Sequence, residues 1–169
     1  MIAQIAATVY VNAAPFLIPY LHLVKGLSLV EAGFIASAPL VGTMLTFTGD
    51  VVQGREMIDR AIELSPRPPG SYFAGKALAH IGERQYDAAL AAALRIDAPN
   101  WLMGHLIVAS AAALAGRTDI AARESERVRE LSAAGNQDLA SAVQRWPIDE
   151  ALAQDFRRGL AAAQVIGTQ

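Results

Sequence analysis

Cysteine is absent from the 169-residue chain, so disulfides, thiolate metal sites and cysteine nucleophiles are all excluded. Histidine is scarce, and the three residues lie far apart in the sequence, which leaves little for a metal site. The net charge of −2 gives no positive excess with which to bind nucleic acid. Charged residues make up only 18% of the chain and hydrophobic residues 53%, a composition that excludes intrinsic disorder over most of its length.

Charge is almost missing from residues 1–48, where Lys25 and Glu31 are the only formally charged side chains. Ile2 to Val24 is a run of 23 residues without a charge, and a membrane-spanning helix needs about 20. We therefore expect residues 1–34 to be a hydrophobic segment that reaches a membrane through residues 2–24, with the rest of the chain in the cytoplasm. A soluble cytoplasmic protein with this segment packed on the remainder is the alternative.

A second apolar stretch, Ala32 to Phe47, is 16 residues long and marginal for a membrane span. Ser28, with Glu31 three residues later, forms a capping-box pattern that predicts a helix start. This stretch either spans a membrane or forms the opening helix, residues 35–48, of a first helical repeat. The sequence leaves both interpretations open.

Three short motifs fall within the two apolar stretches and the turn between them. Asn12 to Tyr20 (NAAPFLIPY), Gly26 to Gly33 (GLSLVEAG) and Ser37 to Gly42 (SAPLVG) resemble the first helix, outer loop and second helix of the major facilitator superfamily. A transporter needs two bundles of helices around a site at the membrane midplane. Two segments cannot form one, so transport by this chain alone is not expected.

Helical spacing and small residues mark the chain after residue 49. We expect turns within helix pairs at Gly49-Asp50-Val51, Arg84-Gln85-Tyr86 and Gly116-Arg117-Thr118, separated by 35 and 32 residues. This period is close to the roughly 34 residues of a tetratricopeptide repeat. The prediction is an all-α, tetratricopeptide-like stack of antiparallel helix pairs over residues 35–135, preceded by a hydrophobic N-terminal helical hairpin and closed by capping helices over residues 136–169. A generic helical bundle is the alternative.

Several short stretches after residue 49 share a pattern with one group of bacterial proteins. They are Arg60 to Pro66 (RAIELSP), Pro69 to Tyr72 (PGSY), Tyr86 to Leu90 (YDAAL) and Arg145 to Ile148 (RWPI). Through them, residues 49–169 resemble the C-terminal repeat region of adenylate/guanylate cyclase-like and winged-helix regulators. In those proteins the catalytic or DNA-binding domain lies upstream, so the resemblance implies the scaffold and not the cyclase activity.

Five side chains on the expected first helices of the second and third repeats are candidates for contact with a partner. The first helices of such a stack face its concave groove, where a peptide would bind. Packing inside the core is the alternative for each of them, whereas Tyr86, beside a turn, is expected in the core. The candidates are Tyr72, Phe73, His80, Trp101 and His105.

Two further patterns are interpreted as helix starts. Gly70 to Lys76 resembles a phosphate-binding loop, but no strand precedes it and no hydroxyl follows the lysine. Asp149 and Glu150 follow Trp146-Pro147 and suit the first turn of a helix, where acidic side chains favour the dipole. Elsewhere we expect helix N-caps at Asp50, Ser71, Asn100 and Asp119.

No nucleophile–base pair or metal set emerges from the sequence, so we expect no enzyme activity, no cofactor and no catalytic residue. The expected function is a non-catalytic helical-repeat scaffold, associated with a membrane, that binds a protein or peptide on its concave face. The alternative is a truncated or fused product that joins a transporter N-terminus to a regulator's repeat tail and has no independent activity.

Overall fold

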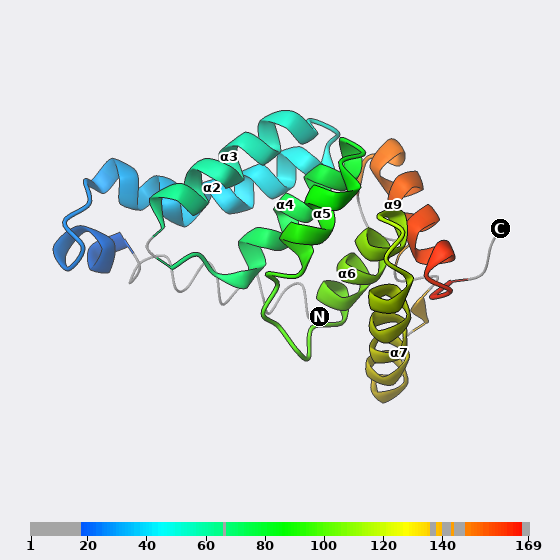
Figure 1. Cartoon of the computed structure of the whole chain (residues 1–169). Coiled ribbons are helices and arrows are strands. Elements are labelled where there is room, and N and C mark those ends of the chain that lie inside the picture. Colours follow the sequence, from blue (N-terminus) through cyan, green and yellow to red (C-terminus); the bar gives the residue numbers. More distant parts are fainter. Residues whose placement is uncertain (1–17, 66, 136–137, 140–142, 144–147, 167–169) are drawn as a thin grey trace.

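The computed structural model describes residues 18–65, 67–135, 138–139, 143 and 148–166, and the regular structure of these residues is helical throughout (Figure 1). Residues 18–23 form a short helical segment ahead of the main helices. The all-α prediction is therefore confirmed for the part of the chain that the structure describes. The main helices are α2 (Leu29–Phe47), α3 (Val51–Leu64), α4 (Gly70–Gly82), α5 (Tyr86–Ala93), α6 (Leu102–Leu114), α7 (Thr118–Ala134) and α9 (Glu150–Ala162).

Six of these helices form three hairpins, α2 with α3, α4 with α5 and α6 with α7, and each hairpin packs on the next through α3 on α4 and α5 on α6. The same turn joins the two helices of every hairpin. One residue has a positive φ, and the next residue donates its N–H to the carbonyl five positions before it, as in a Schellman turn. These bonds run from Asp50 to Leu45 (2.9 Å), from Gln85 to His80 (2.9 Å) and from Arg117 to Ala112 (2.8 Å).

In these three turns, the residues with positive φ are Gly49 (94°), Arg84 (58°) and Gly116 (71°), which lie 35 and 32 positions apart. Glycine adopts this conformation without strain, whereas an arginine there is uncommon. The Arg84 guanidinium is held by Asp155 of α9, with Nε 3.1 Å from Oδ2. The three turns expected from the sequence are thus confirmed in position and share one geometry.

The first hairpin is built on a close approach of two glycines. A Cβ atom on Gly54 would lie 2.5 Å from the carbonyl oxygen of Gly42, and a Cβ atom on Gly42 would lie 2.7 Å from that of Gly54. Residues 32–47 therefore belong to a helix that packs its backbone against α3. The expected domain boundary at residue 34 falls inside α2.

Helix α9 packs against α6 and α4. The Ser110 hydroxyl on α6 donates to the Phe156 carbonyl at 3.0 Å, and Phe156 and Leu160 are fully buried. The main core therefore joins the second and third hairpins to α9. Trp146 and Pro147, which precede the expected start of this helix, lie outside the described residues.

The helix starts agree with the sequence at three places and differ at three. The capping box of Ser28 and Glu31 is present, and Asp50 caps α3 as expected. Asp149 caps α9 through the N–H groups of the first turn. The N-caps expected at Ser71, Asn100 and Asp119 are wrong, because α4, α6 and α7 begin after Pro69, Trp101 and Arg117 without a side-chain cap. The phosphate-loop-like stretch lies within α4, so its interpretation as a helix start is confirmed.

Candidate functional site

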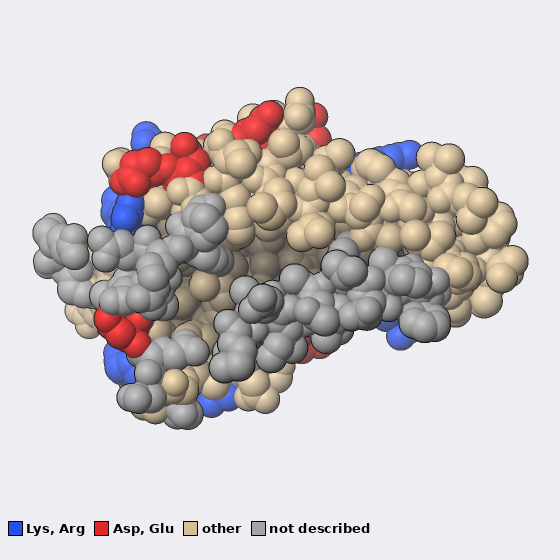
Figure 2. Space-filling model, turned by 180° about the vertical axis from the view of Figure 1, so that it is seen from behind, with Lys and Arg blue, Asp and Glu red and all other residues tan. Residues whose placement is uncertain are grey.

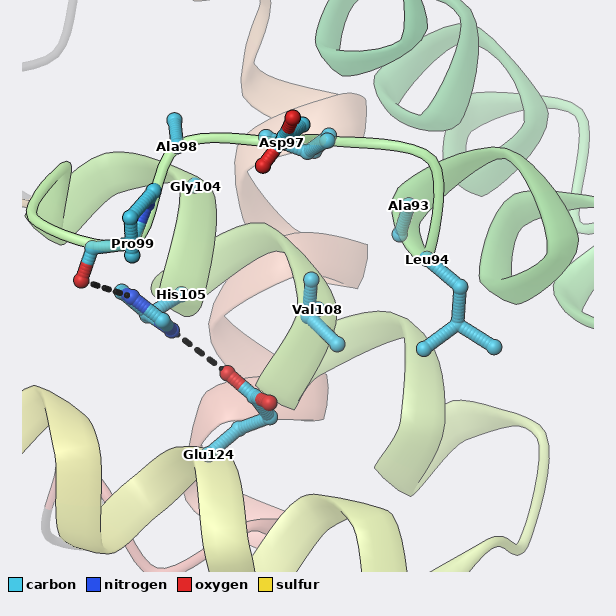
Figure 3. A pocket seen from close by; sticks show the side chains of 10 residues that line it. Ala93, Leu94, Asp97, Ala98, Pro99, Gly104, His105, Val108 and Glu124 are labelled. Atoms are coloured by element: carbon cyan, nitrogen blue, oxygen red, sulfur yellow. Dashed lines mark hydrogen bonds and ion pairs between the residues drawn. The ribbon is translucent and has the colours of Figure 1, made fainter. Parts of the chain in front are cut away.

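The connection between α5 and α6 borders a shallow cavity of about 180 Å³ that α6 and α7 complete (Figure 3). Apolar side chains make up most of its wall, among them Leu94, Ile96 and Val108. Two of its polar groups, His105 and Glu124, face each other from α6 and α7. The cavity can therefore accept a small apolar group beside a polar or positively charged one.

His105 connects the two helices and the loop. Its Nδ1 lies 2.6 Å from Oε2 of Glu124, and its Nε2 lies 3.1 Å from the carbonyl oxygen of Pro99. Both partners accept hydrogen bonds, so a ring that carries hydrogens on both nitrogens satisfies both contacts. Arg127 of α7 also donates to the Pro99 carbonyl and to Oδ1 of Asn100, each at 3.1 Å. The loop is thus fastened to α7 at two points.

Trp101 lies close to this cavity at the start of α6. A Cβ atom on Gly104 would meet the indole ring at 2.9 Å, so the ring packs directly over that glycine. The side chain is half-buried and contacts the main core. Of the five candidates, His105 and Trp101 are therefore the two that the structure brings to one place with some exposed surface.

Tyr72 and Phe73 are each only 3% exposed. The Tyr72 hydroxyl donates to the carbonyl oxygen of Ile35 at 2.9 Å, which ties α4 to α2. The Arg95 guanidinium lies 3.9 Å from the centroid of the Phe73 ring and covers it. These two side chains offer almost no surface to a partner, so we do not include them in a binding site.

Tyr86 was expected in the core but is only half-buried. Its hydroxyl accepts a hydrogen bond from Arg158 of α9 at 2.5 Å, and the guanidinium lies 5.7 Å from the ring centroid. The expectation of a core position is therefore corrected. Tyr86 joins the second hairpin to the closing helix from the surface.

Helix α9 packs on the helices that the sequence predicts to carry the binding face. The first helices of the second and third hairpins are α4 and α6, and α9 packs on both. His80 on α4 is 8% exposed. Helix α9 therefore covers part of the two helices that carry the candidates, and the cavity beside His105 stays open.

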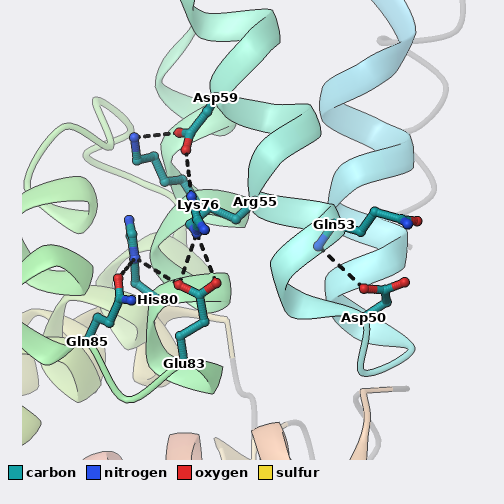
Figure 4. Close-up of polar contacts among 8 residues, drawn as sticks. All are labelled: Asp50, Gln53, Arg55, Asp59, Lys76, His80, Glu83 and Gln85. Atoms are coloured by element: carbon teal, nitrogen blue, oxygen red, sulfur yellow. Dashed lines mark hydrogen bonds and ion pairs between the residues drawn. The ribbon is translucent and has the colours of Figure 1, made fainter.

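A cluster of charged side chains connects α3 to α4 (Figure 4). Nε of Arg55 lies 3.0 Å from both carboxylate oxygens of Glu83, and Nη1 lies 3.2 Å from Asp59. Lys76 lies 2.5 Å from the other oxygen of Asp59. The bond to Glu83 raises the pKa of Arg55. The charges are mutually paired, so we assign the cluster to holding the two hairpins together.

His80 lies at the inner edge of the same cluster. Its Nδ1 is 2.9 Å from Oε1 of Gln85 and 3.6 Å from Oε2 of Glu83. Burial lowers the pKa of His80 and outweighs the opposing effects of Gln85 and Glu83. Sequence reasoning missed this cluster because Arg55 and Glu83 are 28 positions apart, and no local pattern signals such a pair.

Comparison with protein-family models, with curated proteins and with solved structures finds no match to this chain. The candidate site is therefore interpreted from its geometry alone. Within the described residues, no three histidine, aspartate or glutamate side chains lie close enough together to hold a metal ion.

Proposed function

We propose that this chain is a non-catalytic, tetratricopeptide-like scaffold that binds a segment of another protein and is associated with a membrane, with its repeats in the cytoplasm. The observation that supports the proposal is the recurrence of one turn geometry at Gly49, Arg84 and Gly116, at spacings of 35 and 32 residues. A unit of about 34 residues that cannot bury its own apolar face stacks on its neighbours, and such stacks serve as binding surfaces.

The cavity beside His105 is the proposed contact point. Its wall combines an exposed leucine, Leu94, with the carboxylates of Asp97 and Glu124. Such a surface suits a partner segment in which an apolar side chain neighbours a lysine or arginine, since the apolar group fills the cavity and the cation approaches the acidic rim.

Membrane association is supported by α2. Among the described residues, α2 is the helix that is long and apolar enough to cross a membrane by length and composition, and it lies near the N-terminus. Only 39% of its most apolar window is buried, so much of its apolar surface is not covered by the described helices.

Selection from a displayed library of random peptides tests the scaffold proposal. We expect the full chain in detergent to enrich peptides that pair an apolar residue with a basic one, and Leu94→Asp to abolish the enrichment. Val52→Asp, which changes an exposed apolar residue on α3, serves as the matched control and should select the same peptides. An absence of enrichment, or equal enrichment by both variants, would contradict the proposal.

A further inference from the structure

Exposed apolar side chains are concentrated in one part of the molecule. Among the described residues, ten large hydrophobic side chains are exposed, and eight of them lie between Tyr20 and Met44. Four surround the bend before α2: Leu23, Val24, Leu29 and Val30, with 78% and 83% of Leu23 and Val30 exposed. Leu40, Val41 and Met44 continue the surface along α2.

Those of the residues that belong to α2 share one side of the helix. Residues three, four and seven positions apart share a side of a helix, so Val30, Ser37, Val41 and Met44 lie in line. The opposite side carries Ile35, Pro39, Gly42 and Thr46, all of which are buried. The helix thus has two apolar sides, and the hairpin covers only one of them. We call the uncovered side, together with Leu23 and Val24, the apolar face.

Charge is nearly absent from this region. The Glu31 carboxylate is engaged in the capping box, with Oε2 2.9 Å from the Ser28 nitrogen and 2.8 Å from its hydroxyl. The Lys25 ammonium lies 5.8 Å from the centroid of the Tyr20 ring. On the face drawn in Figure 2, the end of the molecule where α2 begins carries few charged side chains, whereas charged groups are denser towards the end that holds α7 and α9. The charges near the start of α2 that belong to α3, Arg60 and Glu63, pair with each other at 3.2 Å.

We propose that the apolar face lies in the interfacial layer of a lipid bilayer, with α2 parallel to the membrane plane and not across it. The proposal rests on the membrane association proposed above and names the surface that provides it. A lysine beside a tyrosine at the edge of an apolar surface is the arrangement that membrane–water interfaces favour.

Packing on the other side of α2 argues against a span. The glycine contact between Gly42 and Gly54 and the bond from Tyr72 to the Ile35 carbonyl both hold α2 to the hairpins. A transmembrane α2 would either break these contacts or carry the charges of α3, such as Arg60 and Glu63, into the hydrocarbon layer.

The composition of the face favours a bilayer over a second copy of the chain as its occupant. The apolar side chains of a protein–protein interface must be matched by a complementary surface of polar and apolar residues on the partner, and the apolar face has seven large exposed side chains, those of Leu23, Val24, Leu29, Val30, Leu40, Val41 and Met44, with little charge beside them. A bilayer requires no matched surface, because binding to it grows with the apolar area that enters the interfacial layer.

Single labels can measure how α2 lies, because the chain has no cysteine of its own. We would place an environment-sensitive fluorophore on Val30→Cys and Met44→Cys, and on Val52→Cys and Leu94→Cys as controls on exposed apolar residues elsewhere. Vesicles of phosphatidylcholine and phosphatidylserine would carry lipid quenchers at defined depths. Positions 30 and 44 are 14 residues apart, which is about 21 Å along a helix.

The expected result is that the labels at 30 and 44 are quenched at the same shallow depth, while those at 52 and 94 do not respond. A depth difference near 21 Å would show a span and overturn the proposal. A response without vesicles that grows with protein concentration would show self-association and overturn it as well, as would the absence of any response to lipid.

A second variant separates this proposal from the scaffold proposal. Val30→Asp should weaken vesicle binding by about tenfold, the factor that corresponds to losing the burial of one valine side chain, and Val52→Asp should leave it unchanged. Unchanged vesicle binding by Val30→Asp would contradict the proposal. Both variants should still select peptides as the parent chain does, so failure of peptide selection concerns the cavity and failure of vesicle binding concerns the apolar face.

Discussion

The first and third hairpins share a turn but differ in the surface that they expose. In the first hairpin, the outer side of α2 is apolar from Leu29 to Met44. In the third, α7 exposes a run of alternating charges from Arg123 to Glu130. The difference shows that a few residues at the turn and at the helix contact specify the hairpin, while the outer surface is free to suit its surroundings.

The charges of α7 face solvent and contribute little to stability. The pair of Arg127 and Glu130, at 2.8 Å, is largely exposed, and so is the pair of Arg129 and Glu126. Such pairs contribute about 0.2–0.5 kcal/mol each. Helix α2 lacks these pairs, so its stability depends on the capping box and on contact with α3.

Close glycine contacts between helices should be equally important for stability at both ends of the molecule. Gly54→Leu brings a side chain against the Gly42 backbone, and Gly159→Leu brings one against the Ser110 carbonyl, only 2.8 Å from the new Cβ atom. We expect each change to lower the free energy of unfolding by about 3 kcal/mol or more, measured by urea denaturation followed by circular dichroism.

Gly33→Ala is the matched control for these substitutions. Gly33 lies in α2, and a Cβ atom added there would meet no other atom within 4 Å, so alanine should stabilise the helix by about 0.5–1 kcal/mol. If Gly54→Leu leaves the unfolding curve unchanged while Gly159→Leu shifts it, the α2–α3 contact is absent in solution and the two ends do not share an architecture.

The ion pair between the first and second hairpins should matter more than any pair on α7. The Glu83 side chain is nearly buried and accepts two bonds from Arg55. We expect Glu83→Gln to cost about 1–3 kcal/mol and Glu130→Gln to cost less than about 0.5 kcal/mol. Equal effects in a thermal or urea melt would refute this ranking.

The helix caps offer a smaller and more local comparison. Ser28 caps α2. Hydrogen bonds from the Ser28 backbone N–H, which has the larger effect, and from its hydroxyl hold the pKa of the Glu31 carboxyl below its usual value. Ser28→Ala should cost about 1 kcal/mol. At the start of α7, Arg117 makes no side-chain cap, so Arg117→Asn should stabilise that end by a few tenths of a kcal/mol to about 1 kcal/mol. Opposite signs in unfolding experiments are the expected outcome, and equal signs would contradict it.

The smallest expected effect is a change in the free energy of unfolding with pH, which arises at the turn between α4 and α5. Its acceptor carbonyl belongs to His80, whereas Leu45 and Ala112 provide the equivalent carbonyls in the other turns. Burial lowers the pKa of His80, and an unfolded histidine titrates near about 6.5. Below that pH the unfolded chain binds more protons, so stability falls as the pH drops from about 6.5 towards the pKa of the folded state, and the full stability is kept above about 6.5.

His80→Gln should remove this part of the pH dependence. Unfolding free energies measured in urea at several pH values between about 5 and 7.5 would show the parent chain losing stability on acidification and the variant losing less. If the free energy of unfolding changes with pH by the same slope in both proteins, burial of His80 does not contribute to the pH dependence.

Local features of the fold were predictable from the sequence, and long-range features were not. The capping box at Ser28 and the turns at Gly49 and Gly116 follow from residue types a few positions apart. The burial of Tyr72 and Phe73 depends on Ile35 and Arg95, which no local pattern connects to them.

The candidate site was predictable only in part, for the same reason. His105 and Trp101 were found because they lie at the start of an expected helix. Their partner Glu124, the pairing of Arg55 with Glu83, and the position of α9 over α4 and α6 all depend on how the hairpins pack. The apolar spacing showed that α2 is a helix, but it did not show which side of the helix would remain uncovered.

Residue-resolved hydrogen exchange at the amides of Asp50, Gln85 and Arg117 tests the central claim most directly. Each amide donates the same bond in its own turn, and exchange reports the free energy of opening it. If the chain is three equivalent hairpins, all three amides are strongly protected. Protection at Gln85 and Arg117 together with unprotected exchange at Asp50 would show that α2 is not paired with α3, and would contradict the account.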